Sequence, residues 1–392
     1  MTYNQARIKF KIEYLIIYPI VLVGKFVGYF YKPKSQPTHF LFFSSADIGG
    51  SVKVNAEITK CISMCNPLII FSKKPKNNKF ISLFEIENVS KIDISNWIDN
   101  KYYHFMNIFF RGMISTWINN SNSPVVFGGE CIFFYKIIPH VKKKCKIVEL
   151  CHMNTWFNYS QAFITRIDAR IFSTMKIMRD LKEQYKKNNI NPQFYERLFF
   201  VDNKIDIKPL RKHKNDKFQI LFVGRGAPQK RVHLLVRIAL LSNQFQLPVH
   251  FNFVGDVETY FDDESKKICN LLGPINDRAI LEEIYDQNDA LILTSAYEGL
   301  PLVVMDMMAR GKIIISTAVD SIPDYIQHMH NGLLIENRSD SMIINDAIEI
   351  IKLIINDELL QEKLSKNAHL FASSHFASEV FDDFYKKILV GH

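Results

Sequence analysis

A chain of 392 residues exceeds what one hydrophobic core usually serves, so two domains are expected. Its 47% hydrophobic and 23% charged residues are typical of a folded protein and exclude a disordered one. The net charge of +9 suits anionic lipid or phosphorylated ligands, whereas we expect no nucleic-acid partner because no motif that reads nucleic acid accompanies the lysines. The six cysteines have no paired CxxC spacing, which predicts reduced thiols in a cytoplasmic protein and no zinc site.

The first 36 residues are apolar and basic. Residues 14–31 carry a single charge, Lys25, but the run is shorter than the about 20 residues of a membrane span and contains Pro19. We therefore predict an N-terminal apolar leader that lies in the plane of an anionic membrane surface, with a helix packed on the protein itself as the alternative. The leader would hold the protein peripherally at the cytoplasmic face of the cell membrane.

Residues 37–205 alternate short apolar runs with helical patterns, as in a parallel-sheet α/β domain. The predicted strands lie at 39–43, 67–71, 125–127, 147–150, 169–172 and 198–201. The polar, basic stretch at 201–217 has no apolar period, which indicates an interdomain linker.

A second alternation of the same kind fills residues 206–372. Its predicted strands lie at 219–223, 249–254, 290–293, 313–315 and 333–335, and its helices near 231–241, 278–286, 301–310 and 342–355. A final helix near 378–389 is expected within a last segment, 373–392. The sequence thus predicts two doubly wound domains, whose ligands bind at the carboxyl ends of the strands.

The segment 295–311 carries the most chemistry. A small-residue turn with Glu298 follows a predicted strand, and Pro301 suits the first turn of a helix because it has no amide hydrogen to lose. The free amides of such a helix start attract phosphate. Asp306 lies eight residues after Glu298, about two helical turns on, so both acids are expected on one side.

A second segment, 221–239, reads as strand, glycine turn and helix. Gly224 keeps the turn compact, and Arg225 and Lys230 are placed to reach a common anion. Cations fixed there would stabilise the charge that develops on a departing nucleoside diphosphate.

Together these segments resemble the E-x7-E and G-R-x4-K patterns of retaining glycosyltransferases of family GT4, the glycosyl transferases group 1. The resemblance implies the GT-B fold, in which two Rossmann-like doubly wound domains face each other across a cleft and the last helix crosses back to the first domain. It also implies that Glu298 contacts the donor sugar, that Asp306 holds the nucleotide ribose, and that Arg225 and Lys230 grip the diphosphate. Asp306 stands where the family has a glutamate, one methylene longer.

The resemblance implies further donor contacts from glycine turns and the helix start. These are Gly49, Gly50, Gly224, Gly273, Ile275, Ser295, Gly299, Leu300, Pro301, Leu302 and Val303. Val319 and Asp320 replace two glycines of the family pattern. On the acceptor side, His152 is the candidate catalytic residue and Glu130 a weaker candidate for an acceptor hydroxyl. Since no D-x-D motif is present, we expect no metal and no cofactor besides the nucleotide sugar.

The predicted function is transfer, with retention, of a sugar from a UDP- or GDP-linked donor to a glycan or lipid-linked acceptor in cell-surface polysaccharide or lipopolysaccharide synthesis. Two alternatives stay open. A nucleotide-sugar epimerase of the GT-B fold would form product without an acceptor. A membrane-bound scaffold that binds sugar nucleotides would turn over nothing.

Overall fold

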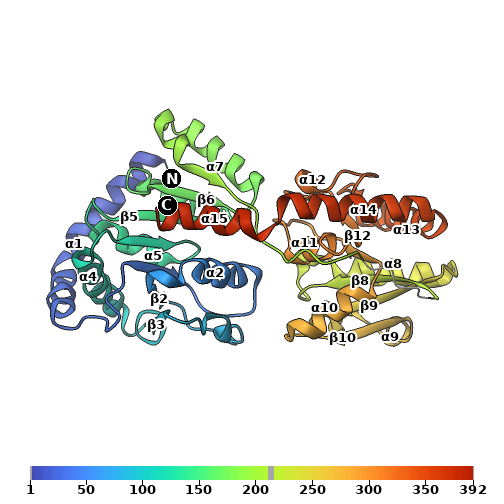
Figure 1. Ribbon diagram of the computed structural model, residues 1–392, viewed down its shortest axis with the longest axis horizontal. Coiled ribbons are helices and arrows are strands. Elements are labelled where there is room, and N and C mark those ends of the chain that lie inside the picture. The colour runs from blue at the N-terminus through green and yellow to red at the C-terminus, as the bar shows by residue number, and fades with distance from the viewer. Residues whose placement is uncertain (1, 211–215, 392) are drawn as a thin grey trace. The chain divides into compact units, whose positions relative to one another are not determined.

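The computed structural model describes residues 2–210 and 216–391, and these form two compact units. Unit 1 holds the chain up to Val201 and again from Glu379, and unit 2 holds Asp202–Ser378 (Figure 1). The sequence placed the domain boundaries after residues 205 and 372. Part of the predicted linker, residues 211–215, lies outside the described residues.

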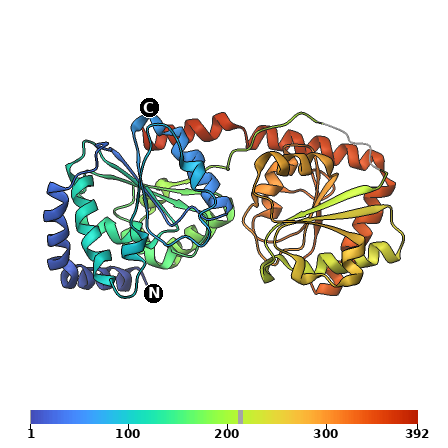
Figure 2. The same ribbon diagram turned by 90° about the horizontal axis from the view of Figure 1, so that it is seen from below.

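Unit 1 is built on a seven-stranded parallel sheet with the order β3-β2-β1-β4-β5-β6-β7. Its strands are β1 (His39–Phe43), β2 (Leu68–Phe71), β3 (Ser90–Asp93), β4 (Val125–Gly128), β5 (Lys146–Cys151), β6 (Ala169–Phe172) and β7 (Leu198–Phe200). The central strands are buried on both faces, because helices cover both sides of a parallel sheet (Figure 2).

The helices of unit 1 connect successive strands, apart from the first and the last helix of the chain. They are α1 (Tyr3–Phe30), α2 (Gly50–Cys61), α3 (Ser95–Ile98), α4 (His104–Asn120), α5 (Ile132–Ile137), α6 (Phe157–Ser160), α7 (Met175–Lys187) and α15 (Ser378–Leu389). The C-terminal α15 packs in unit 1, where the carbonyl of Leu389 is 2.9 Å from Nε2 of His39. The last helix therefore returns to the first domain, as the resemblance implies.

Unit 2 has a six-stranded parallel sheet with the order β10-β9-β8-β11-β12-β13. Its strands are β8 (Phe218–Val223), β9 (Val249–Val254), β10 (Cys269–Gly273), β11 (Ala290–Leu293), β12 (Ile313–Thr317) and β13 (Leu333–Ile335). Its helices are α8 (Val232–Gln244), α9 (Asp263–Ile268), α10 (Arg278–Gln287), α11 (Leu302–Met308), α12 (Ile322–Tyr325), α13 (Asp340–Asn356) and α14 (Glu358–His375).

The N-terminal segment is part of unit 1, as in the alternative of a helix packed on the protein itself, and its place at a membrane stays a prediction. The segment forms α1, a helix of 28 residues that belongs to unit 1 and packs along α4. The approach is close because glycines face each other: a Cβ added at Gly24 would lie 2.0 Å from the Phe109 carbonyl oxygen. Within 2–210 and 216–391 no helix has the length and apolar character needed to cross a membrane.

Candidate functional site

The candidate residues follow strands at the point where each sheet reverses its order. In unit 1 the reversal lies between β1 and β4, and in unit 2 between β8 and β11. Loops on either side of such a point diverge to opposite faces of the sheet, which leaves a crevice at the carboxyl ends of the strands. The two glycine turns and the donor turn predicted from the sequence therefore follow the strands where an α/β domain binds ligands.

In unit 2 the two predicted donor segments are tied together. The amide of Ala296 donates to the Gln229 carbonyl at 2.8 Å, and Gln229 Nε2 donates to the Tyr297 carbonyl at 2.8 Å. Arg231 Nε donates to the Thr294 carbonyl at 2.6 Å. The glycine turn after β8 and the acidic turn after β11 thus form one bonded surface.

Glu298 lies at the centre of this surface, and its side chain is only 8% exposed. Its carboxylate accepts a hydrogen bond from Ser295 Oγ at 2.7 Å and forms an ion pair with Lys230. Its backbone N–H donates to Asp320 Oδ2 at 2.8 Å. The structure therefore brings together three of the predicted residues, Ser295, Lys230 and Glu298.

Asp320 is a residue whose role the sequence reasoning missed. It stands where the family pattern has a glycine and keeps a glycine-like backbone with φ of 47°. Aspartate tolerates this left-handed conformation better than most residues because its short side chain hydrogen-bonds locally. Here that carboxylate holds the Glu298 amide, so Asp320 positions the acidic turn. The sequence shows an aspartate in a turn, which can accept a backbone amide, but only the fold shows that this amide belongs to Glu298.

Arg225 and Lys230, the two cations expected to bind a common anion, differ in their surroundings. Arg225 is exposed, and its side chain has no ion-pair or hydrogen-bond partner within the described part of the chain. Lys230, by contrast, is already neutralised by Glu298. The two loops thus carry one cation without a partner in the described structure and one paired cation.

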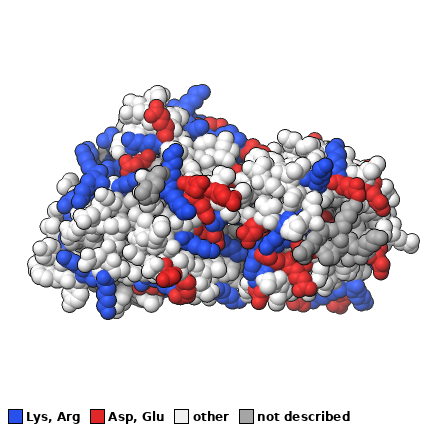
Figure 3. Space-filling model, in the orientation of Figure 1, with Lys and Arg blue, Asp and Glu red and all other residues white. Residues whose placement is uncertain are grey.

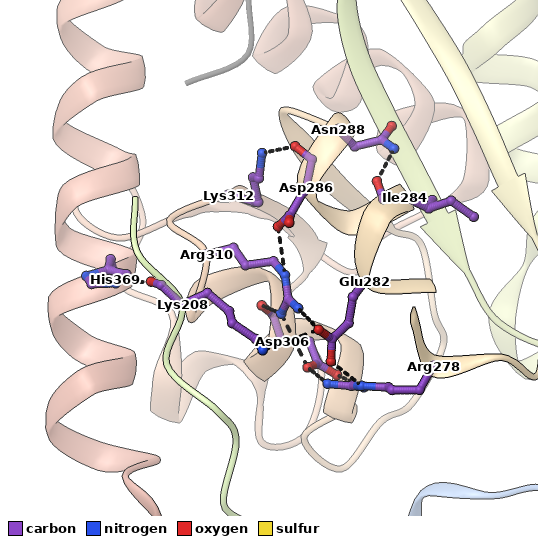
Figure 4. Close-up of polar contacts among 10 residues, drawn as sticks. All are labelled: Lys208, Arg278, Glu282, Ile284, Asp286, Asn288, Asp306, Arg310, Lys312 and His369. Carbon is purple, nitrogen blue, oxygen red and sulfur yellow. Dashed lines mark hydrogen bonds and ion pairs between the residues drawn. The ribbon is translucent and has the colours of Figure 1, made fainter. Parts of the chain in front are cut away.

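Asp306 lies in a separate buried network rather than beside Glu298. Its two carboxylate oxygens accept bidentate hydrogen bonds from Arg278, at 2.7 and 3.2 Å, and Arg310 lies at 3.5 Å (Figure 4). Only 2% of Asp306 is exposed. Glu282 joins the same cluster by pairing with Arg278 at 2.7 Å. Arg278 was not singled out from the sequence, because nothing in the chain pattern links positions 278 and 306.

The turn after Glu298 leads directly into α11. Its predicted donor residues are Gly299, Leu300, Pro301, Leu302 and Val303. Pro301 is the N-cap of α11, so the helix begins one residue later than the sequence indicated and ends at Met308. Of these five residues, Leu300 is buried, Gly299 is exposed and the other three are partly exposed.

Glycines let the loops after β8, β9 and β10 approach one another. Gly255 has a φ of +132°, and a Cβ there would lie 1.8 Å from the Gly224 carbonyl oxygen, so only glycine fits. Its amide donates to the Gly273 carbonyl at 2.9 Å. Gly273 itself has open space around it, and the half-buried Ile275 follows two residues later. These loops lie at the same end of the sheet as the donor segments, at the carboxyl ends of the strands.

In unit 1 the loops after β4 and β5 bring Glu130 and His152 together. Glu130 Oε1 accepts the Met153 N–H at 3.0 Å. Burial, with a smaller contribution from the charge of Glu149, raises the pKa of Glu130 to about 7 against the hydrogen bond from the Met153 amide. Burial also lowers the pKa of His152 to about 4, so its ring is neutral at physiological pH. His152 Nε2 is buried and has no hydrogen-bond partner in the described structure.

The loop after β1 is held by Asp47. Its carboxylate accepts the amides of Lys76, Asn77 and Asn78 at 2.9 to 3.1 Å. Burial opposes its ionisation, but these donors outweigh burial and lower the pKa of Asp47 to about 2. The loop ends at Gly49, the N-cap of α2, which begins at Gly50.

Beside this loop lies a cavity of about 180 Å³. Its lining includes the lysines Lys73 and Lys91 together with Asp93 and the apolar Phe71. The cavity is therefore a small hollow of mixed charge in unit 1, next to the Asp47 loop.

Residues 203–371 match the family model described as "Glycosyl transferases group 1". The match runs from before β8 into α14 and includes every predicted donor residue of unit 2. A glycosyltransferase of Methanocaldococcus jannaschii, itself uncharacterized, is 28% identical over 194 residues, which are 48% of this chain and 52% of that protein. The chain thus spans about half the length of that relative, and less of the next two.

A longer match is the O-antigen biosynthesis glycosyltransferase WbnH of Escherichia coli, 22% identical over 89% of this chain and 98% of that protein. Among solved structures, HepE of Anabaena in complex with UDP and glucose has a TM-score of 0.70 at 15% identity. It covers 90% of this chain and 99% of that one. This likeness confirms the predicted GT-B class of fold, with its two Rossmann-like domains.

Proposed function

We propose that this chain, which belongs to the glycosyl transferases group 1 through its domain at residues 203–371, transfers a sugar from a nucleoside diphosphate donor to a glycan or lipid-linked acceptor. The product would be part of a cell-surface polysaccharide or lipopolysaccharide. One observation carries the proposal: the Lys230 and Glu298 ion pair, beside Arg225, joins two loops at the reversal point of a nucleotide-binding type of sheet.

The donor half of the reaction follows from these charges. As the anomeric bond breaks, negative charge accumulates on the leaving diphosphate, and fixed cations stabilise that transition state more than the ground state. We assign this role to Arg225 and Lys230. Glu298, released from Lys230 when the diphosphate takes the lysine, then accepts hydrogen bonds from the hydroxyls of the donor sugar.

We propose that the anomeric configuration is retained by attack on the face from which the diphosphate departs. Both predicted acids have other partners: Glu298 is held by Ser295 and Lys230, and Asp306, in its separate buried network, by Arg278. None is placed as a covalent nucleophile, and the departing diphosphate itself can accept the proton of the incoming hydroxyl. No metal is needed for this route.

The acceptor half is assigned to unit 1. Glu130 and His152 lie after adjacent strands, and the neutral His152 has an unpartnered Nε2 that can orient a hydroxyl. A lipid-linked acceptor would bring unit 1 to an anionic membrane surface at the cytoplasmic side. The high content of lysine supports this setting.

A transfer assay tests the proposal. Purified protein is incubated in EDTA with UDP- and GDP-linked sugars, with and without lipid extract, and both nucleotide release and the anomer of the product are followed by NMR. We expect release that requires the extract and a product with the donor's configuration. Product without any acceptor would indicate an epimerase. No turnover despite nucleotide binding would indicate a scaffold, and an inverted product would contradict retention.

A further inference from the structure

Helix α1 is apolar around most of its circumference, yet only one side of it is packed. The buried positions share one side and face α4: Ala6, Phe10, Val21, Gly24 and Gly28. The reciprocal contact is just as tight, since a Cβ added at Gly112 of α4 would lie 2.1 Å from the Val21 carbonyl oxygen. These contacts fix which way α1 faces.

The opposite side of α1 carries large apolar side chains that are more than half exposed in the described part of the chain. Six of them define the α1 outward face: Ile12, Leu15, Ile16, Val23, Phe26 and Phe30. At 3.6 residues per turn they fall on one side of the helix, turned away from the packed side. Leu15, Ile16 and Phe26 are 72%, 73% and 69% exposed. A helix that is apolar on both sides is normally buried, and exposed patches of this kind mark an interaction surface.

A row of lysine and tyrosine follows one edge of this face. Lys11, Tyr18 and Lys25 recur every seven residues and therefore align along the helix, and Lys32 follows two residues after its last residue, Phe30. Lys25 Nζ lies 5.3 Å from the centroid of the Tyr18 ring. We call Lys11, Lys25 and Lys32 the basic edge. Such a border of amphipathic rings and cations is what the headgroup region of a bilayer favours.

No acid opposes these lysines on the outward face. The one acidic residue of α1, Glu13, is turned to the protein, where it pairs with Arg111 at 3.2 Å and with Lys136. The surface over α1 and α4 accordingly reads as largely uncharged with cations scattered on it (Figure 3). A second copy placed on this face would bring two basic edges together, whereas anionic lipid complements them.

We propose that the α1 outward face lies in the interface of an anionic lipid bilayer, with the basic edge at the headgroups. Because α1 is locked to α4, it is a rigid contact of unit 1 and not a tether, so it fixes how unit 1 stands on the membrane. The helix lies in the plane of the bilayer. This inference rests on the proposed membrane setting of the function, but not on the transfer reaction.

Flotation of the full-length protein with vesicles tests the inference. The vesicles are phosphatidylcholine alone or phosphatidylcholine with phosphatidylglycerol. The variant Leu15→Ser/Phe26→Ser removes apolar area from the outward face, and Leu359→Ser/Leu370→Ser is the matched control, because these leucines are 79% and 55% exposed on α14. Lys11→Gln/Lys25→Gln/Lys32→Gln neutralises the basic edge.

We expect the native protein and the control to float with the anionic vesicles and to stay bound in high salt. The Leu15→Ser/Phe26→Ser variant should bind about tenfold or more weakly, and the lysine variant should lose the preference for phosphatidylglycerol. Equal flotation of native protein and the Leu15→Ser/Phe26→Ser variant, complete release by salt, or no flotation at all would overturn the inference.

Light scattering on a sizing column tests whether a second copy of the chain, and not lipid, covers the α1 outward face. A native dimer that becomes a monomer in the Leu15→Ser/Phe26→Ser variant would assign the face to a second copy and overturn the lipid proposal. Nucleotide-induced thermal stabilisation, measured on the same samples, reports on unit 2 and is expected to be unchanged in all variants. Failure of lipid binding is thus distinguishable from failure of the proposed donor site.

Discussion

Glu298 combines burial, an ion pair with Lys230 and two further hydrogen bonds in one turn. Glu298→Gln keeps the acceptor for Ser295 but removes the charge. We expect kcat/KM for sugar transfer to fall by roughly 10² to 10³, because the contact with the donor sugar is weakened where it stabilises the transition state. Steady-state kinetics check this. Glu336→Gln, at an exposed glutamate of unit 2, is the control, and a similar loss there would refute a specific role.

We propose that Asp306 holds the ribose, in which case Arg278 competes for its carboxylate, since the Arg278 guanidinium occupies both oxygens. Arg278→Gln should remove this bidentate pair and leave Arg310 as the charged partner of Asp306. We expect the affinity for the ribonucleoside diphosphate, relative to its 2′,3′-dideoxy analogue, to rise about tenfold, the worth of a hydrogen bond to a charged group. Calorimetric titration of both ligands measures the ratio. An unchanged ratio would mean that Asp306 does not hold the ribose.

Glu130 gives the protein a pH dependence with a defined sign. Its pKa is about 7 in the folded chain against an ordinary 4.5, so between these values the folded chain keeps a proton that the unfolded chain has lost. Stability should therefore fall as pH rises through this window, by at most about 3 kcal/mol. The variant Glu130→Gln has an amide in place of the carboxyl, so this position no longer titrates. Thermal denaturation across pH 5 to about 8 should show a flatter profile for the variant, and parallel profiles would contradict the shift.

Single residues were predictable where a local pattern carries the chemistry. Glu298, Lys230 and Ser295 were found from motif spacing, and the structure joins them. Asp320 and Arg278 were not, because each acts on a residue 22 or more positions away through a contact that only the fold creates.

At the scale of elements, the packing of α1 on α4 requires the two helix backbones to meet without side chains between them. Gly112→Ala would place a Cβ 2.1 Å from the Val21 carbonyl oxygen. We expect a loss of about 1 to 3 kcal/mol in the free energy of unfolding, as for other overpacked sites, measured by urea denaturation. Gly49→Ala is the control, since nothing lies within 4 Å of its added Cβ. Equal stability of the two variants would contradict the close packing.

The central strands were predictable because they are buried on both faces and read as continuous apolar runs. The edge strands β3 and β10 were missed. β3 is the polar sequence SKID, and β10 alternates buried and exposed residues, so neither forms an apolar run. The apolar run of α1 was recognised, but its packing on α4 rests on glycine contacts that hydropathy does not record.

On the scale of the whole molecule, both units repeat one topology, with the strand order reversed beside the first strand of each. That repetition follows from the alternation of strand and helix, so the sequence predicts the architecture of each half. Only unit 2 matches the family model, over residues 203–371, and its predicted residues form one bonded surface. Unit 1 resembles the family's sequence pattern only loosely, so the assignment of its acceptor residues relies on their geometry.

Binding of a nucleoside diphosphate by unit 2 is the central claim, and thermal stabilisation by a panel of nucleoside diphosphates tests it most directly. Ligand at about a hundred times its Kd adds about 2.7 kcal/mol to the free energy of unfolding. We predict that one base raises the Tm selectively, and that Arg225→Ala and Glu298→Ala each weaken the response while Arg338→Ala, at an exposed ion pair, does not. A folded protein whose Tm no nucleotide changes would contradict the account.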